Sequence, residues 1–203
     1  MILLLLGKKI APSVPFELNM SKQTITRKGT FDSMHRVMNE RMKCFNVHGH
    51  TYLFELTFGF SQMEDIGYAI DFKEIKRVGC QWIDDILDHG AILNPKDTLL
   101  IDAAASVDSK LYKMSLSGGE EYCNPSVENL VKELFIAQTV LFAPYHHLWI
   151  DHIRLYETPN CFTDCYKDSI SDAERKNFWD YRGEEVAKYR DDKGVVEYDD
   201  RKV

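Results

Sequence analysis

Residues 48–60 of the sequence read HGHTYLFELTFGF and begin with two histidines separated by one glycine. The aromatic and β-prone residues of this stretch are typical of a β-strand. Successive side chains of a strand point to opposite faces, so His48 and His50, separated only by Gly49, point the same way. Two imidazoles on one face form half of a zinc site. The stretch therefore predicts a metal centre at the beginning of a strand.

A third ligand has to come from another segment. Residues 22–33 alternate polar with apolar or β-branched residues, which predicts a neighbouring strand. His35, just past its expected end, is the best candidate. Three histidines leave the fourth position of Zn²⁺ open, as in catalytic sites. Two alternatives stay open: surface histidines without a metal, and a structural site with Cys44 as the fourth ligand.

Cys44, Asp88 and His89 are candidates for proton transfer. A thiolate beside a divalent cation is a ready base or nucleophile, although a lone cysteine is more often a small core residue. The polar loop around Cys44 argues against deep burial. Asp88 can orient the His89 imidazole for acid–base work. A histidine favoured by the dipole at a helix end explains His89 equally simply.

Two glutamates are candidates for binding a substrate. Glu157 ends an otherwise apolar strand, where its carboxylate can pair with a ring N–H and an exocyclic amine, as in guanine- or pterin-like rings. An exposed residue at a strand end is the simpler explanation. Glu128 lies in the first turn of a predicted helix, where the dipole alone favours an acid.

The remaining pattern predicts an α+β domain. Apolar residues recur at helical spacing in 72–93 and 126–142, and 147–158 reads as the last core strand. Residues 67–72 are predicted to form a short strand, and 94–122 reads as an insertion outside the core. Helices between antiparallel strands indicate helices layered on one face of a sheet.

Composition excludes several classes of protein. A net charge of −7 and no basic stripe argue against nucleic-acid binding. Five irregularly spaced cysteines favour reduced thiols and a cytoplasmic protein over a disulfide framework. The apolar run Ile2–Leu6 is too short to span a membrane and lacks the marks of a signal peptide. We expect an extension at 1–19, one domain at 20–170 and a charged extension at 171–203.

Six motifs in this order resemble those of one family. They are TFDSMHR, CFNVHGHTYLFEL, AIDFKEIK, LDHGAILN, PSVENL and LYETP. Together they are similar to the 6-pyruvoyltetrahydropterin synthase / 6-carboxytetrahydropterin synthase family. The resemblance runs from about residue 22 to 166, with a segment at 94–122 that is longer than usual. It does not cover the first 19 residues or the C-terminal tail.

The resemblance implies the T-fold, or tunnelling fold: an antiparallel sheet with two helices packed on one face. It implies that sheets of several copies join into an oligomeric barrel, commonly a homohexamer built as a dimer of trimers, with active sites at subunit interfaces. It implies a zinc enzyme acting on a pterin. The resemblance implies that His35, His48 and His50 are the zinc ligands. It implies that Cys44 is the general base and that Asp88 and His89 form a proton relay. It also implies that Glu157 and Glu128 contact the pterin.

Spacing within the motif favours one activity in this family. Three residues separate Cys44 from His48. That number resembles bacterial 6-carboxy-5,6,7,8-tetrahydropterin synthases of queuosine (7-deazaguanine) biosynthesis, whereas the animal enzymes have five. A folate-pathway variant has Glu instead of the cysteine. The implied reaction converts 7,8-dihydroneopterin triphosphate to 6-carboxytetrahydropterin, acetaldehyde and triphosphate.

Two other functions stay open: a 6-pyruvoyltetrahydropterin synthase, and a non-catalytic T-fold protein that binds a pterin. Both the 6-carboxy- and the 6-pyruvoyltetrahydropterin synthase act on a triphosphate, which needs cations nearby. Arg36, Arg41 and Lys43 are close to the histidines in sequence and are candidates for that role.

Overall fold

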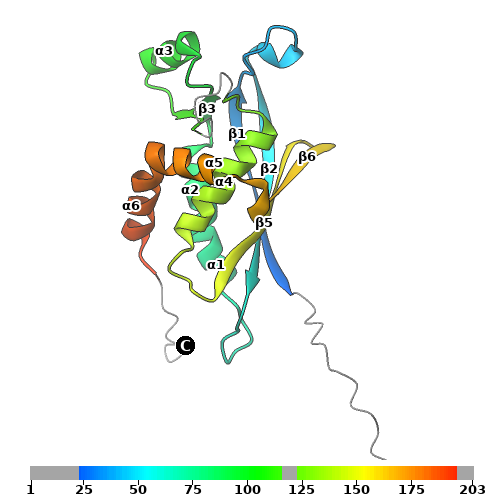
Figure 1. Ribbon diagram of the computed structural model, residues 1–203, viewed down its shortest axis with the longest axis vertical. Helices are drawn as coiled ribbons and strands as arrows, with labels where there is room; N and C mark the ends of the chain where they lie inside the picture. The colour runs from blue at the N-terminus through cyan, green and yellow to red at the C-terminus, as the bar shows by residue number, and fades with distance from the viewer. Residues whose placement is uncertain (1–22, 116–122, 196–203) are drawn as a thin grey trace, which may run out of the picture.

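The computed structural model describes residues 23–115 and 123–195 and is built on one six-stranded sheet. The strand order is β4-β3-β1-β2-β5-β6 (Figure 1). The predicted extension at 1–19 lies outside the described residues, as do parts of 94–122 and 171–203. The strands are β1 Thr24–His35, β2 His48–Phe60, β3 Gly90–Leu93, β4 Leu111–Lys113, β5 Leu148–Thr158 and β6 Cys161–Tyr166.

The sheet is mixed rather than purely antiparallel. Strands β1, β2, β5 and β6 pair antiparallel, as predicted for the core. Strand β3 pairs parallel with β1, and β4 pairs parallel with β3. Parallel neighbours require a crossover connection, and helices supply it here: the segment 72–86 before β3, and α3 (Thr98–Ser106) between β3 and β4.

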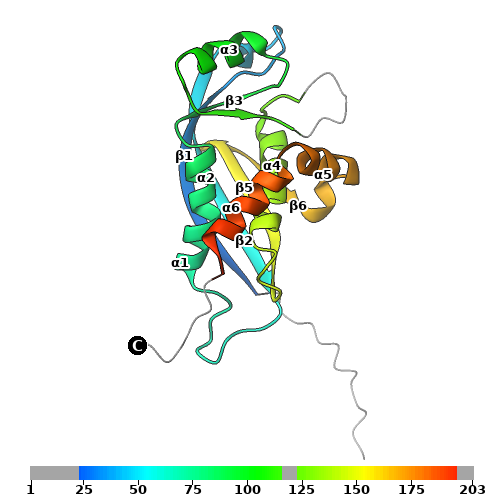
Figure 2. The same ribbon diagram turned by 90° about the vertical axis from the view of Figure 1, so that its left-hand side faces the viewer.

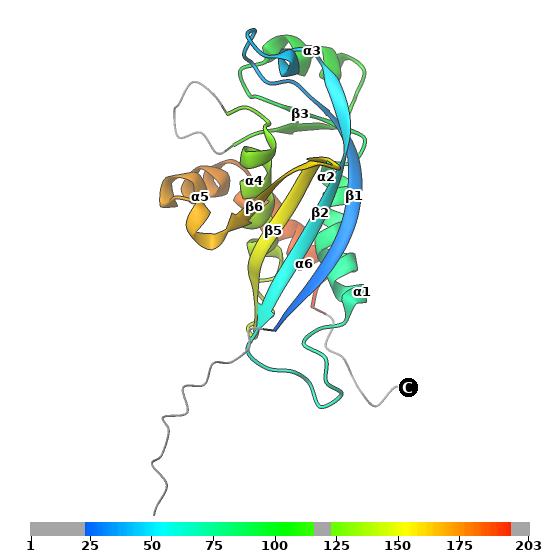
Figure 3. The same ribbon diagram turned by 90° about the vertical axis from the view of Figure 1, so that its right-hand side faces the viewer.

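Two long helical segments cover one face of the sheet (Figures 2 and 3). The first comprises α1 (Phe72–Ile75), a π-helical turn and α2 (Gln81–Ile86), and the second is α4 (Val127–Leu141). Asp71 caps α1 by accepting from the Lys73 N–H, so the strand predicted at 67–72 is wrong. The helix predicted to continue to 93 ends at Ile86. His89 takes φ 55°, and the four buried residues of β3 follow.

The core lies between the sheet and these helices. On β1 and β2, Phe31 pairs with Tyr52, and their rings stack with centroids 4.9 Å apart. Tyr52 begins an alternating series of buried side chains along β2, which ends at Phe58. Trp82 of α2 and Leu130 of α4 belong to the same buried cluster. No helix of the described ranges has the length and apolar character needed to cross a membrane.

The insertion and the tail both contribute to this core. Residues 94–122 were expected to lie outside the core, and that expectation is wrong for the part of the segment that the structure describes. Tyr112 and Met114 are buried because β4 extends the sheet. The tail folds into α5 (Asp172–Phe178), a π-helical turn and α6 (Glu184–Lys193). Both helices pack against α4, and Phe178 and Val186 are buried. These buried apolar residues attach an otherwise charged segment to the core.

A buried ionic cluster joins the insertion and the tail to α4. Glu133 of α4 accepts hydrogen bonds from the Tyr112 hydroxyl and the Ser115 N–H, and Arg182 Nε lies 3.8 Å from its Oε2. Arg182 also donates to the Lys113 carbonyl and lies over the Tyr112 ring, 3.8 Å from its centroid. Burial raises the pKa of Glu133, and the Arg182 charge opposes that rise.

We predict that Arg182→Ala lowers the free energy of unfolding by about 3 kcal/mol, because it leaves the Glu133 carboxylate buried without its cation. Lys188→Ala, at an exposed position of α6, is the control and should change the value by less than about 0.5 kcal/mol. Denaturant unfolding measures both. Equal effects of the two substitutions would show that the cluster does not hold the tail.

Candidate metal centre

Three histidines converge where β1 ends and β2 begins. In the antiparallel register His35 lies opposite His48, and Ser33 lies opposite His50. Alternation therefore directs all three imidazoles to the helix-covered side of the sheet. Nitrogen atoms from the three rings all lie within 4.8 Å of one another, and His35 Nε2 is 3.1 Å from His48 Nε2. The structure thus brings together the three predicted ligands.

The surroundings prepare these rings for a cation. His35 Nδ1 lies 2.8 Å from the Pro125 carbonyl, and His48 Nδ1 lies 2.7 Å from the Asn46 carbonyl. A carbonyl only accepts, so both Nδ1 atoms carry the proton and both Nε2 atoms present a lone pair. His50 Nε2 is buried and has no hydrogen-bond partner within the described residues. Three imidazoles with free nitrogen lone pairs fit a zinc ion.

Local electrostatics favour the neutral imidazoles that metal binding requires. Burial lowers the pKa of His35 and of His50. The Pro125 carbonyl and the Glu157 carboxylate act against this at His35 without reversing it. Glu157 Oε1 lies 3.7 Å from His35 Nε2, so the predicted pterin anchor stands directly beside the triad.

Tyr52 is a further residue of this site that the motif reasoning missed. Its ring centroid lies 5.6 Å from that of His50, and its buried hydroxyl has no hydrogen-bond partner in the described part of the chain. Burial is the main cause that raises the pKa of the Tyr52 hydroxyl, and the charges of Glu157 and of a Cys44 thiolate raise it further. The available signal was the alternation itself, since Tyr52 follows His50 by two residues on the same face.

Cys44 lies in the loop that connects the two histidine-bearing strand ends. It is half-buried within a 3₁₀ turn, Lys43–Phe45, and its carbonyl accepts from the Val37 N–H at 2.8 Å. Arg36 fixes this loop, because its guanidinium lies 5.0 Å from the Phe45 ring centroid. It also donates to both carboxylate oxygens of Asp97.

Of the three cations suggested for the triphosphate, Arg36 is therefore engaged within the chain. Its side chain is largely buried with the Asp97 carboxylate. Arg41 and Lys43 are exposed on the same loop. These two remain the candidates for an anionic substrate group.

Asp88 and His89 form a pair on the other side of the sheet. His89 Nδ1 lies 2.5 Å from Asp88 Oδ2, and Asp88 Oδ1 accepts from the Asp32 N–H at 2.7 Å. The Asp32 side chain alternates with Ser33 along β1 and so faces away from the histidine triad, and His89 lines the surface hollow beside Asp32. The His89 side chain is 78% exposed. No hydrogen bond or ion pair within residues 23–115 and 123–195 joins this pair to the triad or to Cys44.

The Asp88 carboxylate is held in its ionised form. Partial burial raises its pKa, but hydrogen bonds from the Asp32 N–H and from His89 outweigh burial and leave that pKa below its ordinary value. The charges of His89 and Lys110 act in the same direction. An ionised carboxylate fixes the His89 ring with Nε2 directed outward, which suits a proton donor or acceptor for a group supplied from outside.

Glu128 is exposed in the first turn of α4. No polar contact among the described residues connects it with the histidines. Its role in pterin binding stays a prediction.

An open α+β sheet with helices on one face and three histidines at its end defines a T-fold protein with a candidate metal centre. The profile of the 6-pyruvoyl tetrahydropterin synthase family matches residues 24–168. The chain belongs to this family.

Relatives support the assignment over most of the domain. A protein of Rickettsia felis named 6-carboxy-5,6,7,8-tetrahydropterin synthase is 31% identical over 141 residues, covering 68% of this chain and 96% of the relative. The 6-pyruvoyl tetrahydrobiopterin synthase of Dictyostelium discoideum is 33% identical over 86 residues, covering 37% of this chain and 64% of the relative. The chain therefore resembles proteins of both names.

Solved structures confirm the fold. An uncharacterized protein from Wolinella succinogenes superposes with a TM-score of 0.55 at 18% identity, covering 71% of this chain and 98% of that one. The Caenorhabditis elegans 6-pyruvoyl tetrahydropterin synthase gives 0.50 at 16% identity, covering 71% and 94%. At these identities the likeness shows the fold alone.

We predict that the chain binds one Zn²⁺ and that His48→Ala weakens this binding by more than about 100-fold, because a residue that binds the ion directly matters more than the residues that orient it. His152→Ala, on β5 and paired with Asp151, is the matched control and should leave the affinity unchanged. Competition with a chromogenic chelator measures both. If both variants bind zinc as tightly as wild type, the triad is not the binding site.

Proposed function

We propose that this chain is a zinc-dependent 6-carboxy-5,6,7,8-tetrahydropterin synthase of the cytoplasm, acting in queuosine (7-deazaguanine) biosynthesis. It would convert 7,8-dihydroneopterin triphosphate to 6-carboxytetrahydropterin, acetaldehyde and triphosphate. The observation that carries the proposal is the convergence of His35, His48 and His50 with the Glu157 carboxylate beside them. The names of the Rickettsia relatives support the choice of reaction. The odd number and irregular spacing of the five cysteines support a reducing compartment.

Each part of the substrate has a partner of suitable chemistry. Zn²⁺ held by the three Nε2 atoms would supply a Lewis acid that polarises the oxygens of the pterin side chain. Glu157 would accept two hydrogen bonds from the ring N–H and the exocyclic amine, and so place the side chain at the triad. The exposed Arg41 and Lys43 would attract the triphosphate.

Proton transfer would be divided between Cys44 and the Asp88–His89 pair. The Cys44 thiolate would remove a carbon-bound proton from the side chain as triphosphate leaves. His89, oriented by Asp88 through the 2.5 Å contact, would return a proton to carbon. Addition of one water molecule and cleavage of a side-chain carbon–carbon bond would then release acetaldehyde and leave the carboxylated pterin.

This division implies an active site shared between copies of the chain. Within one chain the Asp88–His89 pair lies on the opposite side of the sheet from the triad. The edges of the sheet at β4 and β6 have no further strand partner among the described elements. We therefore propose that copies associate through their sheets into a homohexamer, a dimer of trimers, so that a neighbour's pair meets the metal centre.

A second candidate is a 6-pyruvoyltetrahydropterin synthase, favoured by the Dictyostelium relative. It would stop after elimination of triphosphate, without cleaving the side chain. The three-residue spacing between Cys44 and His48 favours the carboxy product. A non-catalytic pterin-binding protein is a third candidate, and the presence of Cys44 and His89 together weighs against it.

We predict that the zinc-loaded protein produces acetaldehyde and a carboxylated pterin from 7,8-dihydroneopterin triphosphate. Cys44→Ala should lower turnover by at least about 100-fold with zinc retained, since general acid–base catalysis contributes 10²–10⁴-fold. Cys161→Ala, at an exposed thiol of β6, is the matched control. Chromatography of the pterins and an acetaldehyde assay give the products.

The product pattern separates the candidates. Triphosphate release with a pyruvoyl pterin and no acetaldehyde would identify the second candidate. Unchanged substrate bound to the zinc protein would identify the third. Loss of zinc in Cys44→Ala would make the thiol a ligand instead of the base.

We further predict that two inactive variants restore activity to each other. In mixed oligomers of Cys44→Ala and His89→Ala, some sites would combine an intact Cys44 with an intact Asp88–His89 pair from a neighbour. Refolding or co-expressing the two variants should recover about a quarter of the wild-type turnover if subunits mix at random in equal amounts. Oligomers shown by mass spectrometry to be mixed, yet inactive, would contradict a shared site.

A further inference from the structure

The two ends of the insertion are joined by side-chain amides. Asn94 follows β3, where the insertion leaves the core, and Asn124 precedes α4, where the chain returns. Asn94 Nδ2 donates to Asn124 Oδ1 at 3.1 Å. The Asn94 side chain is almost fully buried, and its Oδ1 accepts from the Lys96 N–H. We call the Asn94–Asn124 contact the amide clasp.

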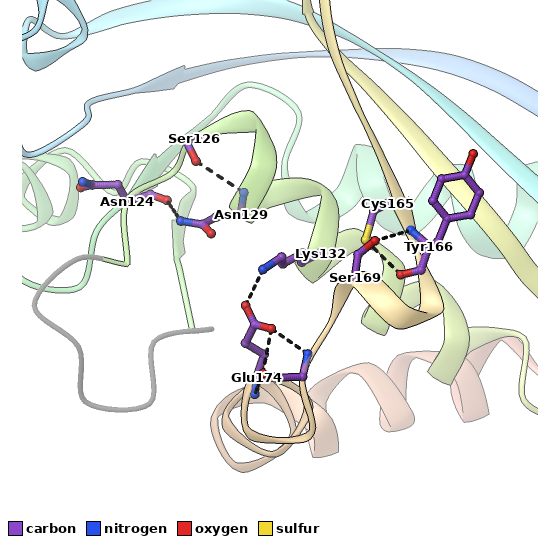
Figure 4. A network of polar contacts seen from close by, with 9 residues as sticks. Asn124, Ser126, Asn129, Lys132, Cys165, Tyr166, Ser169 and Glu174 are labelled. Atoms are coloured by element: carbon purple, nitrogen blue, oxygen red, sulfur yellow. Dashed lines mark hydrogen bonds and ion pairs between the residues drawn. The ribbon is translucent and has the colours of Figure 1, made fainter.

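Asn124 is fixed from two further directions. Its Oδ1 also accepts from the Met38 N–H at 2.9 Å, on the loop that follows His35. Its backbone carbonyl accepts from Asn129 Nδ2 at 3.0 Å, and the Asn129 N–H donates to the Ser126 hydroxyl (Figure 4). Asn124 is therefore hydrogen-bonded to Asn94 and to the Met38 N–H through its side chain and to Asn129 through its backbone carbonyl.

The next residue along the chain contacts a predicted metal ligand. The Pro125 carbonyl accepts from His35 Nδ1 at 2.8 Å, and both groups are buried. This contact sets the His35 tautomer and fixes the rotation of its ring, so it decides where Nε2 points. The direction of a backbone carbonyl is set by the conformation of the chain around it. Its direction depends on the neighbours that fix the chain, chiefly Asn124.

We propose that Asn94 and Asn124 are positioning residues for the metal centre: the amide clasp aims the Pro125 carbonyl at His35 and so directs Nε2 toward the cation. The proposal rests on the metal centre of the proposed function. It assigns a role to the base of the insertion, where the LDHGAILN and PSVENL motifs meet. In this proposal neither asparagine is a ligand of the cation or a contact of the substrate.

Two isosteric substitutions with the same change of charge separate this role from general stability. Asn94→Asp removes the donor and sets a carboxylate against Asn124 Oδ1, which breaks the clasp. Asn124→Asp keeps an acceptor oxygen for both Asn94 Nδ2 and the Met38 N–H, which preserves it. Each variant adds one negative charge near the triad. A difference between them therefore reports the direction of the hydrogen bonds.

The experiment measures binding of Zn²⁺ to the full chain by chelator competition at neutral pH. We expect Asn94→Asp to bind Zn²⁺ about 10-fold or more weakly than wild type, the usual cost of losing an outer-shell partner. Asn124→Asp should stay within about 3-fold. Lys132→Gln breaks the ion pair between Lys132 of α4 and Glu174 of α5, also drawn in Figure 4, and should leave the affinity unchanged.

A second readout reports the geometry of the site. With Co²⁺ in place of Zn²⁺, the visible absorption spectrum should change in Asn94→Asp and match wild type in Asn124→Asp and Lys132→Gln. Thermal unfolding of the metal-free proteins shows that each variant is folded. If Asn94→Asp does not fold, Asn94→Ala removes the same donor without adding a charge, and the same loss of affinity is expected.

The outcomes are distinct. Equal Zn²⁺ affinity of Asn94→Asp and wild type, or equal losses in Asn94→Asp and Asn124→Asp, would overturn the role of the clasp. In both cases wild type still binds Zn²⁺ and His48→Ala does not, so the metal centre stands. If wild type itself binds no Zn²⁺ through the triad, the proposed function fails, and the clasp proposal fails with it.

Discussion

The pairing of His35 with His48 across β1 and β2 is the constraint on which the rest of the site depends. A slip of one residue in this register would turn every side chain of one strand to the other face. The buried pair Phe31–Tyr52, four residues further from the strand ends, opposes such a slip, because it would expose an aromatic ring. The same hydrophobic pattern that builds the core thus places three imidazoles together.

The two faces of the sheet carry different halves of the chemistry. The covered face holds the triad and Glu157, and burial there lowers the pKa of His35 and of His50. The open face holds the Asp88–His89 pair beside Asp32, with the imidazole in solvent. On the proposed function, a site that uses both halves would draw on more than one chain. Oligomerisation would then have two reasons: it would complete the active site, and it would bury the edges of the sheet.

Sequence reasoning predicted the elements that depend on local pattern and missed those that depend on tertiary contacts. Alternation was enough to predict that His48 and His50 share a face, and the strand predicted next to them pointed to His35 as the third ligand. Strand β3 was missed because Gly90–Leu93 is a short apolar run that equally continues a helix. The buried role of Arg182 was hidden because an arginine in a charged tail reads as solvent-exposed, and only the fold brings Glu133 to it.

The central claim is that three histidine nitrogens, without the Cys44 thiol, hold a zinc ion whose remaining position is open to substrate. X-ray absorption at the zinc edge tests this most directly on the zinc-loaded protein. We predict a first shell of nitrogen and oxygen at about 2.0–2.1 Å, changed by addition of a pterin substrate. A sulfur scatterer at about 2.3 Å, present with and without the pterin, would contradict the claim and identify a closed structural site.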